Sequence, residues 1–178
     1  MKITYQQIIN NDTVKTYIKK ADESLSALGY TEHSFTHVGK VAKTASDILL
    51  TLGYSEHEAE LARIAGYLHD IGNVINRIDH AQSGAVMAFR ILDKMEMDAE
   101  DIATIITAIG NHDESTGGAK DAIGAALIIA DKSDVHKSRV KDKLLNAETN
   151  IHDRVNLSIA KNSLVVDRKN NKIRLVIF

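Results

Sequence analysis

The stretch Leu61-Ala62-Arg63-Ile64-Ala65-Gly66-Tyr67-Leu68-His69-Asp70 decides the fold, because it joins an apolar helical run to a polar doublet. Its apolar residues are typical of a buried helix, and His69-Asp70 stands where the core should continue. Burying an ionised carboxylate is expensive unless a hydrogen bond or a positive charge meets it. A metal cation can bind both an imidazole and a carboxylate, so the doublet predicts a metal site inside a helical core.

Length and composition fit one domain over residues 1–178, with enough chain for a sizeable core. The chain has 22 Lys and Arg against 24 Asp and Glu, so its net charge of -2 indicates neither a nucleic-acid partner nor an anionic membrane. It has no cysteine, so any metal ligands must be nitrogen and oxygen atoms. No run approaches the roughly 20 apolar residues of a membrane span, and the start lacks the apolar core of a signal peptide. We therefore expect a cytoplasmic protein.

Helical periodicity dominates most of the chain, and we expect a helical core over about residues 12–148. Apolar residues recur at helical spacing between Thr31 and Gly53, and Ser55-Glu56-His57-Glu58 resembles a capping box that starts the next helix. Further helices are expected over about 80–95, after a cap at Asp98, and over the apolar run 123–130. These features predict a mainly α protein.

The pattern changes near Asn150. Apolar residues alternate over about 155–159, and short apolar runs follow at 164–166 and 173–177. Such runs, separated by asparagine-containing turns, predict a small C-terminal antiparallel β meander over about 153–178. An exposed strand edge invites pairing, so the meander either covers the pocket or forms a homodimer interface.

Further histidines and aspartates end other apolar stretches, and together with the doublet they form one candidate ligand set: His37, His69, Asp70, His80, His112, Asp113 and Asp131. Asp131 follows Leu127 by four residues on the most apolar helix, which leaves its carboxylate no solvated face. A lone core histidine is usually a hydrogen-bonded structural residue rather than a ligand, but a cluster of this size is hard to explain structurally. His57, His136 and His152 are read as solvated side chains. His33 lies one turn before His37 on the same helix face, and we read it as a partner of a ligand or as an exposed side chain, with a rival ligand as the alternative.

The ordered set of a separated histidine, a His-Asp doublet and a later aspartate resembles the HD-domain superfamily of metal-dependent phosphohydrolases. The stretches that carry the resemblance are His37-Val38-Gly39-Lys40, His69-Asp70-Ile71-Gly72 and Ala130-Asp131-Lys132, within about residues 31–140. It implies an HD-domain helical bundle, to which the β meander is appended. The segments around His80 and His112 are similar to those of two-metal branches of the superfamily.

The resemblance to two-metal branches implies two divalent ions. One would be held by His37, His69, Asp70 and Asp131, and the other by Asp70, His80, His112 and Asp113. Imidazole and carboxylate ligands favour iron or manganese, with zinc, nickel and cobalt as other options. Three carboxylates in one pocket repel each other, whereas two divalent ions make the pocket attractive to phosphate. Metal binding lowers the pKa of water from 15.7 to about 7, so hydrolysis through a metal-activated hydroxide needs no nucleophilic side chain.

Three cations near the proposed ligands are candidates for binding the phosphate of the substrate: Arg77, Lys132 and Arg139. Asp70, shared by the two expected ions, is the central residue of this catalytic site. The other reading of these three residues is ordinary surface charge. The chain departs from the cyclic-di-nucleotide phosphodiesterases of the superfamily at two places. It has Asn73 where they have a lysine, and His112-Asp113 where they have a His-His pair. Their specific activity is therefore not implied.

The sequence predicts a metal-dependent phosphohydrolase that cleaves a phosphoester or phosphoanhydride of a nucleotide or similar small phosphorylated molecule. One alternative is a non-catalytic regulatory protein that binds the metal and a nucleotide. Another is a single-metal enzyme in which His80 and His112 bind phosphate or transfer protons. Metal stoichiometry separates the single-metal enzyme from the two-metal one.

Overall fold

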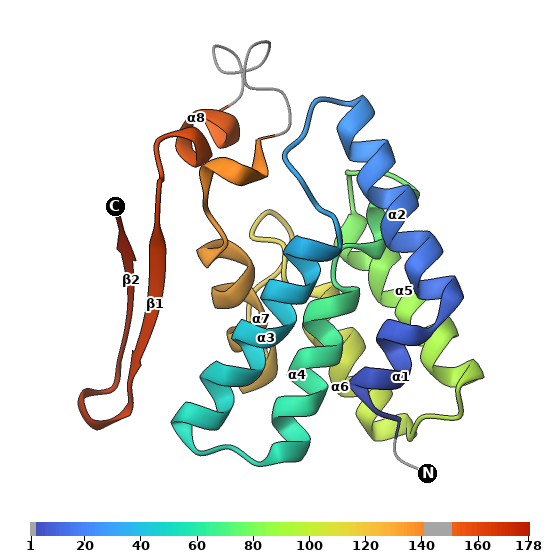
Figure 1. Ribbon diagram of the computed structural model, residues 1–178. Coiled ribbons are helices and arrows are strands. Elements are labelled where there is room, and N and C mark those ends of the chain that lie inside the picture. The colour runs from blue at the N-terminus through green and yellow to red at the C-terminus, as the bar shows by residue number, and fades with distance from the viewer. Residues whose placement is uncertain (1–2, 141–150) are drawn as a thin grey trace.

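The computed structural model describes residues 3–140 and 151–178, without the side chains of 151–153, and it is mainly helical (Figure 1). The α-helices of the described residues are α1 (Tyr5–Asn10), α2 (Asp12–Ala27), α3 (Phe35–Leu52), α4 (Glu56–Leu68), α5 (His80–Lys94), α6 (Ala99–Gly110), α7 (Ala122–Ser133) and α8 (Ile151–Leu157). Short 3-10 turns are η1 (Ile71–Val74), η2 (Lys137–Arg139) and η3 (Arg168–Asn170), and the strands are β1 (Asn162–Asp167) and β2 (Lys172–Ile177). The mainly helical fold class is confirmed.

Helices α3 and α4 form the centre of the bundle, with α7 and the hairpin on one side and α1, α2 and α5 on the other (Figure 1). Their apolar faces are fully buried, as at Val41 and Ile64. Gly66 allows the two backbones to approach closely, since a Cβ there would lie 2.8 Å from the Cα of Ala42. The carboxyl end of α4, where the His69-Asp70 doublet lies, is thereby fixed against α3.

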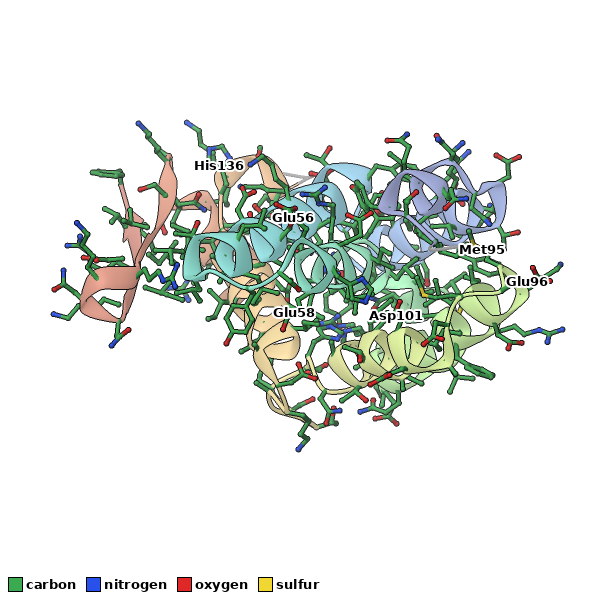
Figure 2. The ribbon with its side chains drawn as sticks, turned by 90° about the horizontal axis from the view of Figure 1, so that it is seen from below. Glu56, Glu58, Met95, Glu96, Asp101 and His136 are labelled. Atoms are coloured by element: carbon green, nitrogen blue, oxygen red, sulfur yellow. The ribbon has the colours of Figure 1, made fainter. Side chains whose placement is uncertain are left out.

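The start of α4 is set by the expected capping box (Figure 2, where Glu56 and Glu58 are labelled). The amide of Glu58 donates to Ser55 Oγ at 3.2 Å, and the amide of Ser55 donates to Glu58 Oε2 at 2.9 Å. The expected cap of α6 is present too, because Asp98 accepts from the amide of Glu100 at 2.9 Å. Both helix starts predicted from the sequence are confirmed.

The turn after α4 brings the start of α5 against the doublet. A Cβ at Gly72 would overlap the main-chain oxygen of His80 and lie 2.5 Å from the amide nitrogen of Gly84. Only glycine leaves room for α5 at this distance. His80 is consequently buried at the first position of α5, next to the His69-Asp70 pair.

The helix expected from Thr31 begins instead at Phe35. Ser34 is its N-cap, with Oγ accepting from the amide of Thr36 at 3.2 Å, and this hydroxyl cap sets the start. His33 lies in the segment before the helix, where its amide donates to Asp22 Oδ1 at 3.0 Å. The expectation that His33 shares a helix face with His37 was therefore wrong.

The C-terminal meander is also smaller than expected. The stretch over 155–159 was predicted as a strand, but α8 runs through Leu157, and Ile159 accepts a hydrogen bond from the amide of Lys137 in η2 at 3.0 Å. Alternating apolar residues alone do not supply a partner strand, and this segment packs on η2 instead. The sheet is a two-stranded hairpin, paired from Asn162 with Ile177 to Asp167 with Lys172. The proposed end of the helical core at 148 and the side chain of His152 lie outside the described residues.

The hairpin lies along α3 at the side of the bundle (Figure 1). Leu164 of β1 packs against the core, whereas its cross-strand partner Leu175 is 39% exposed. The strands do not line the cavity described below, among the residues that the structure describes. Pairing of the hairpin with a second copy remains a prediction. In the same residues, none of the helices has the length and hydropathy needed to cross a membrane.

Candidate metal centre

Three segments distant in sequence bring four proposed ligands together: α3 carries His37, the end of α4 carries His69 and Asp70, and α7 carries Asp131. Asp70 Oδ2 lies 3.2 Å from His69 Nε2 and 3.6 Å from His37 Nε2. Asp131 Oδ1 lies 3.3 Å from His37 Nε2 and 3.6 Å from His69 Nε2. Two atoms bound at about 2.1 Å to one ion lie roughly 3 Å apart when their bonds are perpendicular, so the spacing suits a shared ion.

The two imidazoles of this group are oriented by their outer nitrogens. His69 Nδ1 lies 2.8 Å from the carbonyl oxygen of Gly66, and His37 Nδ1 lies 2.8 Å from Asp134 Oδ2. Both partners are acceptors, so each Nδ1 carries the hydrogen and each Nε2 offers a lone pair. Neither Nε2 has a hydrogen-bond partner among the described residues, although both are buried. Buried nitrogens in this state fit metal ligation.

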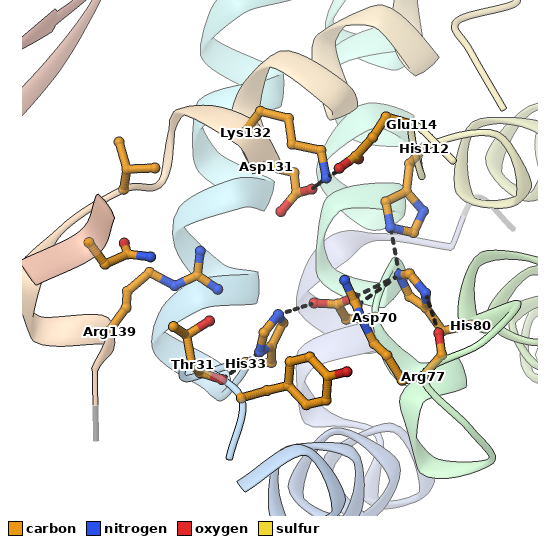
Figure 3. A pocket seen from close by; sticks show the side chains of 13 residues that line it. Thr31, His33, Asp70, Arg77, His80, His112, Glu114, Asp131, Lys132 and Arg139 are labelled. Carbon is orange, nitrogen blue, oxygen red and sulfur yellow. Dashed lines mark hydrogen bonds and ion pairs between the residues drawn. The ribbon is translucent and has the colours of Figure 1, made fainter. Parts of the chain in front are cut away.

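A second pair of imidazoles, His80 and His112, lies near the other oxygen of Asp70, and Figure 3 shows this pair beside the carboxylate. His80 Nε2 is 3.5 Å from Asp70 Oδ1 and 3.3 Å from His112 Nε2. The Nδ1 atoms again face carbonyl oxygens, with His80 at 3.1 Å from Arg77 and His112 at 2.7 Å from Ile109. The two oxygens of Asp70 therefore face two different histidine pairs, so this carboxylate could contribute to a metal site on either side.

The electrostatics of the cluster reflect opposed charges buried together. Burial lowers the pKa of His69, but Asp70 and Asp131 outweigh this effect and raise that pKa to about 10. Burial raises the pKa of Asp70 and of Asp131, yet the neighbouring imidazoles hold both carboxyl pKa values well below their usual range. Burial lowers the pKa of His112 to about 4, so this imidazole is neutral near pH 7. Without a metal, an added proton on His69 Nε2 partly neutralises the carboxylates, and metal binding displaces this proton and frees the lone pair of Nε2.

Comparisons with known proteins agree with this arrangement. A family model described as "HD domain" matches residues 34–147. The chain belongs to the HD-domain family. It is 28% identical over 173 residues to an uncharacterized protein of Methanocaldococcus jannaschii, covering 85% of this chain and 66% of the relative.

A solved structure shares the fold of this HD domain. It is a predicted HD superfamily hydrolase from an uncultured Thermotogales bacterium, with a TM-score of 0.53, 26% sequence identity, and coverage of 68% of this chain and 66% of that chain. This chain thus spans 66% of the length of each of these two relatives. The HD domain accordingly has the fold of a superfamily of hydrolases and carries a His/Asp cluster suited to a metal.

Asp113 is the proposed ligand that the structure sets apart from the others. Its Oδ2 lies 3.4 Å from His80 Nδ1, the outer nitrogen of that ring, and its Oδ1 accepts from the amide of Ser115 at 3.0 Å. It is not among the grouped ligand atoms that lie within 4.8 Å of one another. Asp113 therefore contacts the Nδ1 side of His80 and lies away from the Nε2 atoms that converge on Asp70.

The three proposed phosphate-binding cations of the HD domain all line one cavity of about 150 Å³ together with Asp70, His80, His112 and Asp131. Lys132 Nζ is held 2.6 Å from Glu114 Oε2 and 3.1 Å from Asp131 Oδ2 (Figure 3). Arg139 donates to the carbonyl oxygens of Glu32 and Asp134, at 2.7 and 2.8 Å. These two cations are thus engaged with protein groups.

Arg77 is placed differently. Its guanidinium lies over the ring of Tyr30, 5.7 Å from the centroid, and Nη1 lies 3.3 Å from His80 Nε2. Nη1 is also 3.5 Å from Asn73 Oδ1. The stacked guanidinium therefore reaches the second histidine pair directly.

Two residues that orient the cluster were missed by the sequence analysis. Buried Asp134 faces His37, and it follows Asp131 by three residues, a spacing that indicated a shared helix side. Asn73, seen in the sequence only as a departure from relatives, donates through Nδ2 to Asp70 Oδ1 at 2.9 Å. The spacing of residues in the sequence does not predict the bond from Asn73 to Asp70, because this bond depends on the turn after α4.

The remaining described histidines have different surroundings. His57 is 39% exposed at its side chain and lies 2.8 Å from Asp101 Oδ1, and His136 is partly exposed with Nε2 2.8 Å from the carbonyl oxygen of Ala160. Both lie outside the cavity lining. The side chain of His33, by contrast, is only 13% exposed, and it lines the cavity.

Proposed function

We propose that this HD domain is a phosphohydrolase that uses two divalent ions to cleave a phosphoester or phosphoanhydride of a nucleotide or similar small phosphorylated molecule. One observation carries the proposal: the two oxygens of Asp70 face two histidine pairs, and the outer nitrogens of all four rings are fixed on oxygen acceptors. A purely structural core has no use for such converging lone pairs.

In this proposal His37, His69 and Asp131 would hold one ion, His80 and His112 would hold the other, and Asp70 would contribute one carboxylate oxygen to each. Asp113 positions His80 through its outer nitrogen instead of acting as a ligand. The nitrogen and oxygen ligand set favours iron or manganese, with zinc, nickel and cobalt as alternatives. When bound, such ions polarise a phosphoryl group and activate water for its hydrolysis.

The three cations support one position for the phosphate end of the substrate. Arg77 presents a planar guanidinium beside His80, and guanidinium groups bind phosphate through paired hydrogen bonds. Lys132 is paired with Glu114, and Arg139 donates to backbone carbonyls. In this proposal both therefore line the cavity without binding the phosphoryl group directly. We therefore expect the phosphoryl group next to Arg77 and the second histidine pair.

Elemental analysis of anaerobically purified protein, followed by phosphate-release assays on mono-, di- and cyclic nucleotides and dinucleoside polyphosphates, tests this function. Asp70→Ala should lose both metal and turnover. Asp101→Asn, which changes an aspartate paired with His57 outside the cavity, serves as the control and should retain both. Full activity in folded Asp70→Ala overturns the proposal. Nucleotide binding without product, whatever ion is loaded, indicates the regulatory alternative.

A further inference from the structure

His33 lies on the wall of the cavity in the segment before α3, between Thr31 and the start of the helix (Figure 3). Its side chain is 13% exposed, and its ring packs edge-on against that of His37 with centroids 5.4 Å apart. The pairs His37–His69 and His69–His112 have similar spacings of 5.3 and 5.0 Å. His33 therefore extends the line of imidazoles by one ring.

The ring of His33 is oriented like those of the proposed ligands. Nδ1 lies 2.6 Å from the carbonyl oxygen of Thr31, which only accepts hydrogen bonds, so Nδ1 carries the hydrogen. Nε2 then offers a lone pair and lies 3.9 Å from Asp70 Oδ2. This distance is too long for a hydrogen bond, and the two facing atoms are both acceptors. A cation or a proton donor that binds both atoms would satisfy them together.

The oxygen that His33 faces is the same one that faces His69 and His37, at 3.2 and 3.6 Å. Three imidazole nitrogens thus approach Asp70 Oδ2, while His80 approaches Oδ1. A cation at the Oδ2 side satisfies all three lone pairs together, whereas one bridging water has only two hydrogens to donate. The convergence favours a cation.

We propose that His33 is an additional ligand of the ion assigned above to His37, His69, Asp70 and Asp131. The inference rests on the proposed metal centre. With five protein ligands, that ion has little room for substrate. His80 and His112 would hold the less surrounded ion, and the phosphoryl group would bind on that side of the cavity, where Arg77 lies. The two ions therefore differ in role: one is held mainly by the protein, and the other binds substrate.

Cobalt(II) tests the assignment without any assay of activity, because its visible absorption grows stronger as the number of ligands falls. We would titrate metal-free wild-type protein and His33→Phe with Co²⁺, and measure affinity by competition with a chelator. His33→Phe should bind the tighter ion roughly tenfold or more weakly and show a more intense absorption band. His57→Phe, which removes a histidine outside the cavity, should behave as the wild type.

The outcomes separate this inference from the proposed function. If wild-type protein binds two Co²⁺ ions and His33→Phe matches it in affinity and spectrum, His33 is no ligand, and the two-ion centre still stands. If wild-type protein binds no Co²⁺, the metal centre itself is wrong and the role of His33 falls with it. His33→Asn, with a smaller polar side chain, gives the same test if the phenylalanine variant does not fold.

Discussion

His37 Nδ1 donates a 2.8 Å hydrogen bond to Asp134 Oδ2, and both side chains are buried. The other oxygen of Asp134 accepts from Lys40 Nζ at 2.5 Å. The carboxylate therefore fixes which nitrogen of His37 faces Asp70 and Asp131. Outer partners of this kind hold the tautomer and the ring orientation that metal ligation requires.

Asp134→Asn should weaken metal binding by about 10- to 100-fold, because the neutral amide no longer holds His37 Nδ1–H as firmly. Competition of the loaded protein with a metal chelator measures the loss. Lys40→Gln is the matched control, since it removes the ion pair at the other oxygen of Asp134 and leaves both the bond to His37 and the longer contact of Arg139 Nε with Asp134 Oδ2 at 3.8 Å. An equal loss in both variants would assign the effect to the ion pair with Lys40 and not to the histidine.

Removing one imidazole of the second pair should lower metal stoichiometry without emptying the centre. His112 Nε2 lies 3.3 Å from His80 Nε2 on the Oδ1 side of Asp70. His112→Gln should therefore take the bound metal from two ions per chain towards one and abolish most of the turnover. Elemental analysis after gel filtration checks the count. Retention of two ions, or loss of both, contradicts separate sites on the two sides of Asp70.

Much of this centre could be predicted from the sequence, because helical spacing and apolar neighbours indicate which polar residues turn inward. His37, His69, Asp70 and Asp131 meet as expected, although they come from three distant segments. The orienting contacts could not be predicted in the same way. The bond from Asn73 to Asp70 depends on the tight turn at Gly72, and the orientation of His33 depends on the carbonyl of Thr31.

The errors at the C-terminus have a similar origin. The alternation over 155–159 fits a strand, but a strand needs a partner with free backbone groups. Ile159 is instead buried, and its carbonyl oxygen accepts from the amide of Lys137 in η2. The periodicity of apolar residues within a segment does not predict such a contact with a distant part of the chain. The hairpin strands were predictable because they pair with each other across a short turn.

Arg77→Met should raise the KM for a phosphorylated substrate roughly tenfold, because it removes the guanidinium beside His80 and keeps an unbranched apolar stem. Weaker inhibition by inorganic phosphate should accompany the change. Arg90→Met alters an exposed arginine on α5 outside the cavity and should leave both constants unchanged. If phosphate inhibits Arg77→Met as strongly as wild type, Arg77 does not bind the phosphoryl group.

Acid should destabilise the metal-free protein over a defined range. Burial lowers the pKa of both His33 and His112 to about 4, against an ordinary value of 6.5. Between these two values the unfolded chain binds more protons, so the free energy of unfolding falls as pH falls from about 6.5 to 4. Each group contributes up to about 1.4 kcal/mol per pH unit. The pKa of His69, raised to about 10, opposes this slope only near pH 6.5, where the unfolded histidine is partly deprotonated. At lower pH His69 is protonated in both states.

Urea unfolding in the presence of a chelator, repeated at several pH values, measures this slope. His112→Gln removes one of the buried imidazoles with a lowered pKa, a set that includes His33 and His80, and should reduce the slope by up to about one proton. Parallel curves for wild type and variant would contradict a neutral, buried His112 in the metal-free fold.

The close crossing of α3 and α4 can be tested with two glycines that both lie inside these helices. Gly39 has open space around an added Cβ, so Gly39→Ala should stabilise the fold by about 0.5 to 1 kcal/mol through helix propensity. Gly66→Ala gains the same propensity, but its Cβ would lie 2.8 Å from the Cα of Ala42 and 2.9 Å from its amide nitrogen. Backbone atoms cannot move aside cheaply, so the helices must separate, at a cost of about 1 to 3 kcal/mol. Thermal unfolding of the metal-free variants should therefore move in opposite directions, and a stabilised Gly66→Ala would show that the crossing tolerates a wider spacing.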